Sequence, residues 1–222
     1  MLRGVKRIGF DVDNTLYRMN KKMQCKVRWQ IYELTAKKLG IPVEQARGQF
    51  EAGYKKTCSG RKTLVAMGLA AKEAKNTVQE AIETADIAAQ IKPNQGLRKN
   101  LQKLRGRGVC VDIVTGTSAR LAMKKLKKLG IPQEIFCCRV YGSTRYTKSD
   151  GSAYKVWVRK AKCKPKELLY VGDNEHADFK MPRKMGMRAI LLRYGEKERR
   201  VGRDWVVPSV KRACELLLEE LP

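Results

Sequence analysis

Residues 10–17 read Phe-Asp-Val-Asp-Asn-Thr-Leu-Tyr, a stretch that contains two closely spaced aspartates near the start of a basic chain. An apolar run ends at Asp11, and a single valine separates this aspartate from Asp13. Side chains at positions i and i+2 of a strand point to the same side. A short buried strand over residues 6–10 would therefore present both carboxylates at its carboxyl end. We predict that the two acids act as a pair.

Further strand patterns follow along the chain, and helical patterns lie between them. Apolar and β-branched runs predict strands at residues 109–115, 135–141, 168–171, 189–192 and 205–207. Strands that alternate with helices indicate a parallel sheet with helices on both faces. The sequence therefore predicts an α/β fold, a Rossmann-like three-layer core around a central parallel sheet.

One interval interrupts this alternation. Residues 17–92 contain no convincing strand and have the pattern of several helices, and Pro and Gly at residues 93–96 mark the end of the interval. We therefore expect two domains. Residues 1–16 and 93–222 would form the Rossmann-like catalytic core, and residues 17–92 an inserted, all-helical domain.

The composition limits the class of protein. A length of 222 residues is enough for one α/β domain with an insertion. The seven cysteines form no Cys-x-x-Cys pair and His176 is the only histidine, so neither a zinc site nor a disulfide framework is expected. No apolar run is long enough to span a bilayer, and the first one is too short and too acidic for a signal peptide. We expect a cytoplasmic protein with no membrane partner.

The chain is strongly basic, with 48 Lys and Arg, 22 Asp and Glu, and a net charge of +26. Such a field attracts anions, and these could be small phosphate esters, nucleic acids or acidic surfaces. Basic stretches lie at residues 98–107, 120–128, 155–166 and 193–203. They favour, as an alternative function, a nucleic-acid-end phosphatase or an RNA-associated protein.

Polar residues follow the predicted strands. A Thr-Gly pair at residues 115–116 follows the second strand, Asp173 follows the fourth, and Asp178 comes five residues later. In an open parallel sheet, binding sites form outside the carboxyl ends of the strands, so these groups should meet the first two aspartates. Carboxylates held together need a cation, and oxygen ligands without usable His or Cys favour Mg²⁺.

The motifs together resemble those of the haloacid dehalogenase superfamily. Residues 11–15, Asp-Val-Asp-Asn-Thr, match its first motif, Thr115 matches the second, and residues 172–178, Gly-Asp-Asn-Glu-His-Ala-Asp, match the fourth. The helical insertion after the first strand resembles the first class of cap domain. Residues 10–17 and 53–56 look most similar to the pyrimidine 5′-nucleotidase-like or phosphoglycolate phosphatase-like branch.

The superfamily's third motif is a lysine, and two residues compete for it. Related chains often carry Lys-Pro-Asp-Pro about two dozen residues before the fourth motif, and counting back without gaps reaches Lys148. This lysine stands in Lys-Ser-Asp-Gly, which lacks both prolines. Lys155, on the helix that follows, is the alternative.

The resemblance implies distinct roles for the first two aspartates. Asp11 would be the nucleophile that forms an aspartyl-phosphate, and Asp13 would be the general acid and base. The dehalogenases of the superfamily need no acid for their leaving group and lack the second aspartate. The presence of Asp13 therefore favours phosphoryl transfer.

The resemblance also implies binding groups for the phosphate and the metal. Thr115, Gly116 and Lys148 would bind the substrate phosphate, and Thr115 and Lys148 would also count as catalytic residues. The implied Mg²⁺ ligands are Asp11, the backbone carbonyl of Asp13 and Asp173, with Asp178 orienting them or binding through water.

The sequence thus predicts a Mg²⁺-dependent phosphoric monoester hydrolase that acts on a nucleotide or sugar phosphate. A phosphomutase would carry the same motifs and remains a further alternative. We expect a monomer or a homodimer whose partner is a small anionic phosphate ester.

Overall fold

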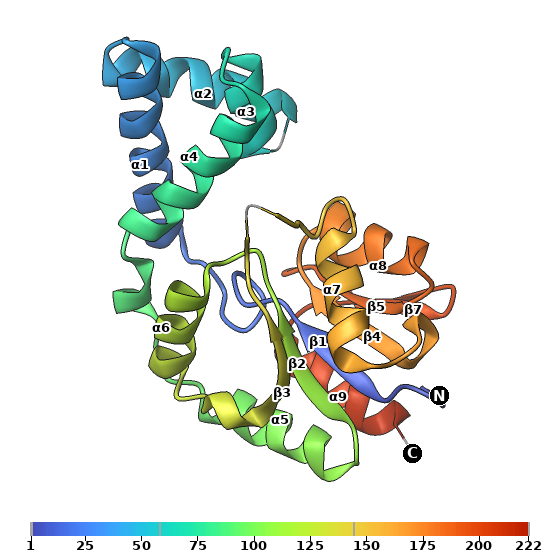
Figure 1. Ribbon diagram of the computed structural model, residues 1–222. Coiled ribbons are helices and arrows are strands. Elements are labelled where there is room, and N and C mark those ends of the chain that lie inside the picture. The colour runs from blue at the N-terminus through green and yellow to red at the C-terminus, as the bar shows by residue number, and fades with distance from the viewer. Residues whose placement is uncertain (1, 58, 144, 222) are drawn as a thin grey trace. The chain divides into compact units, whose positions relative to one another are not determined.

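Seven strands pair into one sheet in the computed structural model, which describes residues 2–57, 59–143 and 145–221 (Figure 1). Their spatial order is β3 (Phe136–Val140), β2 (Cys110–Val114), β1 (Arg7–Phe10), β4 (Leu168–Gly172), β5 (Arg188–Leu192), β7 (Asp204–Val207) and β6 (Arg199–Val201). All neighbours are parallel except β6, which runs antiparallel to β7. The expected α/β fold is confirmed. The sequence missed β6, because this exposed edge strand of three residues has no apolar alternation.

The order of the strands reverses at β1, which lies between β2 and β4. Phe10 pairs with Ile113 of β2 on one side and with Val171 of β4 on the other. The carboxyl ends of these three strands therefore lie level with one another. A crevice at such a reversal is the usual place for a ligand in an open α/β sheet.

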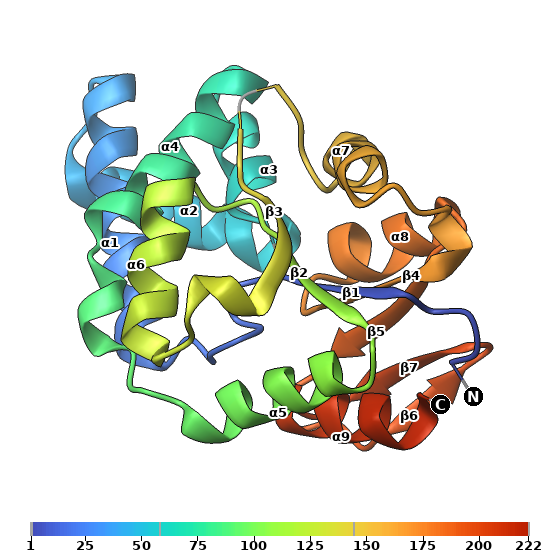
Figure 2. The ribbon, with the colours of Figure 1, turned by 60° about the horizontal axis from the view of Figure 1, so that its bottom comes forward.

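Helices cover both faces of the sheet (Figure 2). On one face, α5 (Gln95–Gly106) packs against α9 (Val210–Glu220) and β2. On the other face, α7 (Ser152–Ala161) packs against β3 and β2, and the short α8 (Met181–Lys184) packs against β5. The helix α6 (Ala119–Leu129) connects β2 to β3. Helices thus lie between the strands, as the predicted alternation requires.

One carboxylate lies in the middle of the buried strand β2. Asp112 is fully buried, and Arg7 donates two hydrogen bonds of 2.7 Å to its carboxylate. The indole N–H of Trp157, from α7, donates a third bond of 2.8 Å. A buried charge is tolerated when it is paired and its lone pairs are satisfied. Asp112 is therefore a structural residue in the middle of β2, away from the carboxyl edge of the sheet.

The chain divides into two units, one of Met1–Arg18 with Ile91–Pro222 and one of Met19–Gln90. The second unit contains α1 (Lys21–Leu39), α2 (Val43–Thr57), α3 (Gly60–Ala66), α4 (Ala71–Thr84) and the 3₁₀ turn η1 (Ile87–Gln90). Asn20 caps α1, since its side chain accepts a hydrogen bond from Met23 N–H, and Gly40 ends that helix in a left-handed conformation. The role of this helical unit as a cap domain stays a prediction. Across the described residues, no helix combines the length and hydropathy needed to cross a membrane.

Candidate active site

Asp11 and Asp13 lie in the turn that leaves β1, at the reversal of the strand order. The N–H of Asp11 donates to Val171 O at 3.0 Å, which ties the end of β1 to β4. The turn closes tightly because Leu16 N–H bonds back to Val12 O at 3.0 Å and Asn14 adopts a left-handed conformation, with φ of 54°. Asparagine tolerates this conformation better than most residues. The local sequence thus places the two aspartates on one turn.

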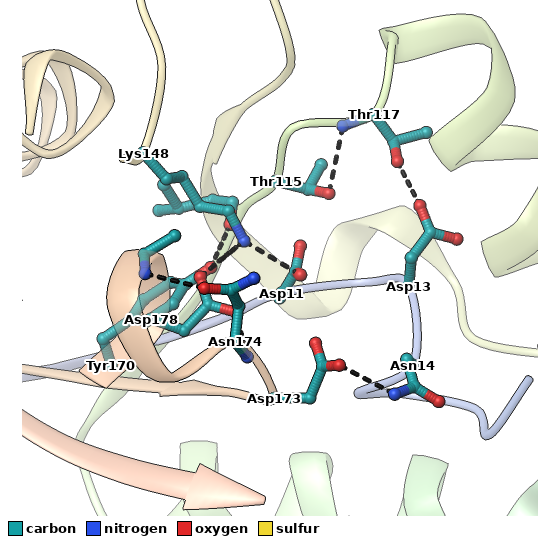
Figure 3. A network of polar contacts seen from close by, with 12 residues as sticks. Asp11, Asp13, Asn14, Thr115, Thr117, Lys148, Tyr170, Asp173, Asn174 and Asp178 are labelled. Carbon is teal, nitrogen blue, oxygen red and sulfur yellow. Dashed lines mark hydrogen bonds and ion pairs between the residues drawn. The ribbon is translucent and has the colours of Figure 1, made fainter. Parts of the chain in front are cut away.

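Lys148 reaches this turn from the loop between β3 and α7 (Figure 3). Its Nζ lies 2.9 Å from Asp11 Oδ2 and 2.7 Å from Asp178 Oδ1. Burial alone lowers the pKa of the Lys148 ammonium, but the charges of Asp11 and Asp178 outweigh it and hold the pKa above its ordinary value. Lys155, the alternative, is exposed on α7. The structure brings Lys148 into the carboxylate cluster.

Three carboxylates form this cluster. Asp11, Asp173 and Asp178 each offer an oxygen within 4.8 Å of the others. Asp173 directly follows β4, and the fully buried Asp178 lies in a π-helical segment, η4 (Glu175–Lys180). Burial raises the pKa of Asp11 to about 6, and it also raises the pKa values of Asp173 and Asp178.

A glycine permits the approach of Asp178 to β4. A Cβ on Gly172 would lie 2.4 Å from Asp178 Oδ2, which no real side chain allows. The same Oδ2 accepts the backbone N–H of Asn174 at 3.1 Å. π-Helical turns often occur at functional sites. This one turns Asp178 back toward the end of β4.

The cluster fits a hard divalent cation. Asp11 Oδ1 is buried, and no hydrogen-bond donor among the described residues reaches it. The ammonium of Lys148 compensates only part of the charge of three close carboxylates. Oxygen ligands of this kind suit Mg²⁺ or a similar ion.

The loop after β2 carries Thr115 and Gly116, as the sequence predicted. Thr115 N–H donates to Val140 O at 2.9 Å, and Thr115 Oγ1 accepts Thr117 N–H at 3.2 Å. The loop also packs against Gly142, whose N–H donates to Thr117 O at 2.8 Å. A Cβ on Gly142 would lie 1.9 Å from Gly116 O. The sequence analysis missed Gly142, since a single glycine after a strand carries no signal of this contact.

Asp13 has partners that the sequence analysis did not find. Lys125 Nζ donates to Asp13 Oδ1 at 2.5 Å, and the hydroxyls of Thr117 and Tyr17 also donate to the carboxylate. Burial by itself raises the pKa of Asp13, but Lys125, followed by the two hydroxyls, outweighs it and lowers the pKa below its ordinary value. The structure thus holds Asp13 as a carboxylate.

The position of Lys125 in the helical pattern could have indicated that it is buried. It lies on α6 between Leu121 and Leu129, four residues from each, in the stripe that this helix buries. Its side chain has no exposed surface. A lysine in an otherwise apolar stripe indicates a buried partner, although the pattern does not say which one.

Two further residues surround Asp173. Asn14 Nδ2 donates to Asp173 Oδ2 at 2.7 Å, and Arg193 donates to the carbonyl of Asp173 at 3.3 Å. Tyr194 OH donates to Asn14 O at 3.0 Å, which links the end of β5 to the turn after β1.

His176 is exposed, with a ring nitrogen 3.2 Å from Ser149 O.

The site thus places acids and a lysine at the reversal point of a parallel α/β sheet. The chain matches the family of haloacid dehalogenase-like hydrolases over residues 8–192, and it belongs to that family. No curated protein sequence matches the chain significantly.

Solved structures of similar fold span nearly the whole chain. A HAD phosphatase from Thermococcus onnurineus shares 18% identity at a TM-score of 0.66, over 98% of this chain and 100% of its own. A 2-haloacid dehalogenase from Pseudomonas syringae pv. Tomato DC3000 shares 18% identity at 0.59, over 97% and 99%. CbbY from Rhodobacter sphaeroides, in complex with phosphate, shares 18% identity at 0.59, over 93% and 95%. At these identities the likeness shows the fold.

Proposed function

We propose that the protein is a Mg²⁺-dependent phosphatase that hydrolyses a phosphate monoester through an aspartyl-phosphate on Asp11. The observation that carries the proposal is the position of Lys148, which pairs with Asp11 and Asp178 at the point where the strand order reverses. Two-step phosphoryl transfer requires a nucleophilic carboxylate, a positive charge beside it and a nearby acid or base. Asp11, Lys148 and Asp13 are suited to these three roles.

Each residue has a chemical task in this proposal. The carboxylate of Asp11 attacks phosphorus, and the bond from phosphorus to the ester oxygen breaks. Asp13 takes up a proton from solvent when substrate is bound and gives it to the departing oxygen. In the second step Asp13, again a carboxylate, accepts a proton from the water that attacks phosphorus, and the bond from phosphorus to Asp11 breaks. Thr115 Oγ1 and the Gly116 N–H bind phosphate oxygens, and Lys148 compensates the negative charge that gathers on them.

The proposed metal site uses residues that already lie together. Asp11, Asp173 and the backbone carbonyl of Asp13 would hold Mg²⁺, with Asp178 orienting them or binding through water. When bound, this cation supplies electrostatic compensation for the phosphoryl group.

Asp13 separates the proposed reaction from dehalogenation. A halide leaves without a proton, so a dehalogenase has no use for an acid beside its nucleophile. In this chain Asp13 is held by three donors, from α6, from the loop after β2 and from its own turn. These donors fix the carboxylate of Asp13 beside Asp11, where it can accept a proton from the hydrolytic water.

The test is a screen of phosphate esters with Mg²⁺, comparing the wild type with Asp11→Asn. The wild type should release phosphate, and the variant should lose the activity. An acid-quenched reaction should show, by mass spectrometry, one phosphoryl group on the peptide that contains Asp11. Equal phosphate release from both proteins would place the activity elsewhere.

Two further arms sharpen the screen. Asp13→Asn should reduce turnover of alkyl phosphates by about 10²–10⁴-fold, the usual worth of acid–base catalysis. A short 2-chloro acid tests the dehalogenase reaction, and chloride release that depends on Asp11 without phosphatase activity would overturn the proposal.

The nucleic-acid-associated and phosphomutase alternatives stay predictions, as does the cytoplasmic location. A salt titration of binding to a generic RNA tests the first, because contacts with phosphates weaken as salt rises. Incubation with sugar phosphates, followed by analysis for isomeric products, tests the second.

A further inference from the structure

Tyr170 places a phenol in the middle of the fully buried strand β4. Its ring packs edge-on against Tyr154, with ring centroids 5.0 Å apart, and against Trp157, at 6.1 Å. Phenylalanine would fill the same space, whereas a buried hydroxyl must find hydrogen-bond partners. The contacts of this hydroxyl therefore show what tyrosine adds.

The hydroxyl of Tyr170 links two parts of the active site. It donates its proton to the carbonyl of Val114, the last residue of β2. Its oxygen then accepts a hydrogen bond from Lys148 Nζ at 3.2 Å, and the ammonium also lies 5.5 Å from the centre of the Tyr170 ring. Figure 3 shows Tyr170 and Lys148 side by side.

The two other partners of Lys148 are Asp11 and Asp178. In the proposed reaction, Asp11 changes state because its carboxylate becomes bonded to phosphorus as an acyl phosphate. Tyr170 is neutral and does not react, and its bond to Val114 anchors it to β2. Like Asp178, it therefore stays unchanged through both chemical steps, but unlike Asp178 it carries no charge and has no role at the proposed metal site. A lysine side chain is flexible and needs such an anchor to keep its ammonium in one place.

The geometry points to Tyr170 as a positioning residue that holds the ammonium of Lys148 beside Asp11. Through its bond to Val114 O, Tyr170 also ties this ammonium to the residue that precedes Thr115. This inference rests on the proposed function, because it assigns a partner to the lysine of that reaction.

Tyr170→Phe tests the inference, with Tyr154→Phe as the matched control. Tyr154 is also fully buried and donates to a backbone carbonyl, Ala177 O, at 2.7 Å, so each variant loses one such bond. We expect Tyr170→Phe to lower kcat for p-nitrophenyl phosphate by about 10-fold, close to the lower end of what a hydrogen bond to a charged group contributes. KM should change by less than about 2-fold, and Tyr154→Phe should keep nearly the wild-type kcat. Thermal melts of both variants would check that each of them folds.

A double-mutant cycle separates positioning from general packing. If Tyr170 acts through Lys148, Tyr170→Phe should have little further effect once Lys148 is replaced by Met. Equal losses of kcat in Tyr170→Phe and Tyr154→Phe, or a full 10-fold loss in the Lys148→Met background, would overturn the inference. A wild-type protein that hydrolyses no phosphate ester would instead overturn the proposed function.

Discussion

Lys148 Nζ lies 2.9 Å from Asp11 Oδ2, and this contact joins the loop after β3 to the end of β1. Sequence spacing left Lys148 and Lys155 as alternatives for the same role. We expect Lys148→Met to lower kcat/KM for p-nitrophenyl phosphate by about 10²–10³-fold, the usual loss when one electrostatic group of an active site is removed. Lys155→Met is the matched control and should stay close to wild type. A larger loss from the control would reverse the assignment.

The buried pair of Asp13 and Lys125 predicts a stability effect that depends on which partner is removed. Asp13→Ala leaves the ammonium of Lys125 buried without its counter-charge, and we expect a loss of roughly 3–5 kcal/mol in the free energy of unfolding. The double variant with Lys125→Met should recover most of this loss, since an apolar side chain suits the stripe on α6. Urea unfolding of the wild type, both single variants and the double variant measures these effects, and losses that simply add in the double variant would contradict the prediction.

The raised pKa of Asp11 predicts a dependence of stability on pH. In the folded protein this pKa is about 6, above the unfolded value of about 3.9, so the folded state binds the proton more tightly. The stability from this group is complete below the unfolded pKa and is lost as the pH rises through about 6. Asp11→Asn does not titrate. In EDTA, its stability relative to wild type should therefore improve by roughly 1–3 kcal/mol between pH 4 and pH 8. A difference that stays constant across this range would show that Asp11 has an ordinary pKa.

Added Mg²⁺ should stabilise the folded protein, because the three clustered carboxylates lie together only in that state. At about 100 times Kd the gain is about 2.7 kcal/mol, which raises the melting temperature by roughly 5–10 °C for a chain of this size. EDTA should remove the gain and Asp173→Asn should prevent it. Glu175→Gln is the control, since Glu175 is an exposed neighbour paired with Lys180 and Arg193. The same Mg²⁺ response in Asp173→Asn would place the ion elsewhere.

Gly142→Ala should disrupt the loop that holds Thr115. The added Cβ would lie 1.9 Å from Gly116 O, so the backbone has to move. We expect a loss of about 1–3 kcal/mol in stability, as for other overpacked positions, together with a raised KM for phosphate esters. Gly106→Ala, where a Cβ meets nothing within 4 Å, is the control and should neither lower the stability nor raise KM. An unchanged KM in Gly142→Ala would show that this loop does not bind the substrate.

Much of the fold could be predicted because its signals are local. A buried parallel strand is a continuous apolar run, and a strand end is marked by the residues that follow it. For this reason the positions of Asp11, Asp13, Thr115 and Asp173 at the carboxyl edge were predicted from the sequence, and the structure has them there. The edge strand β6 escaped prediction because it is short, exposed and rich in arginine.

The sequence by itself determined the order of the strands other than β6, the helices between them and the acids that follow β1 and β4, since spacing along the chain specifies these. Only the tertiary structure decided which lysine meets Asp11, that Lys125 pairs with Asp13, and that Tyr170 and Gly142 support the site. These contacts join segments that are far apart in sequence. No local pattern encodes such distances, and the packing of helices and loops around the reversal at β1 sets them.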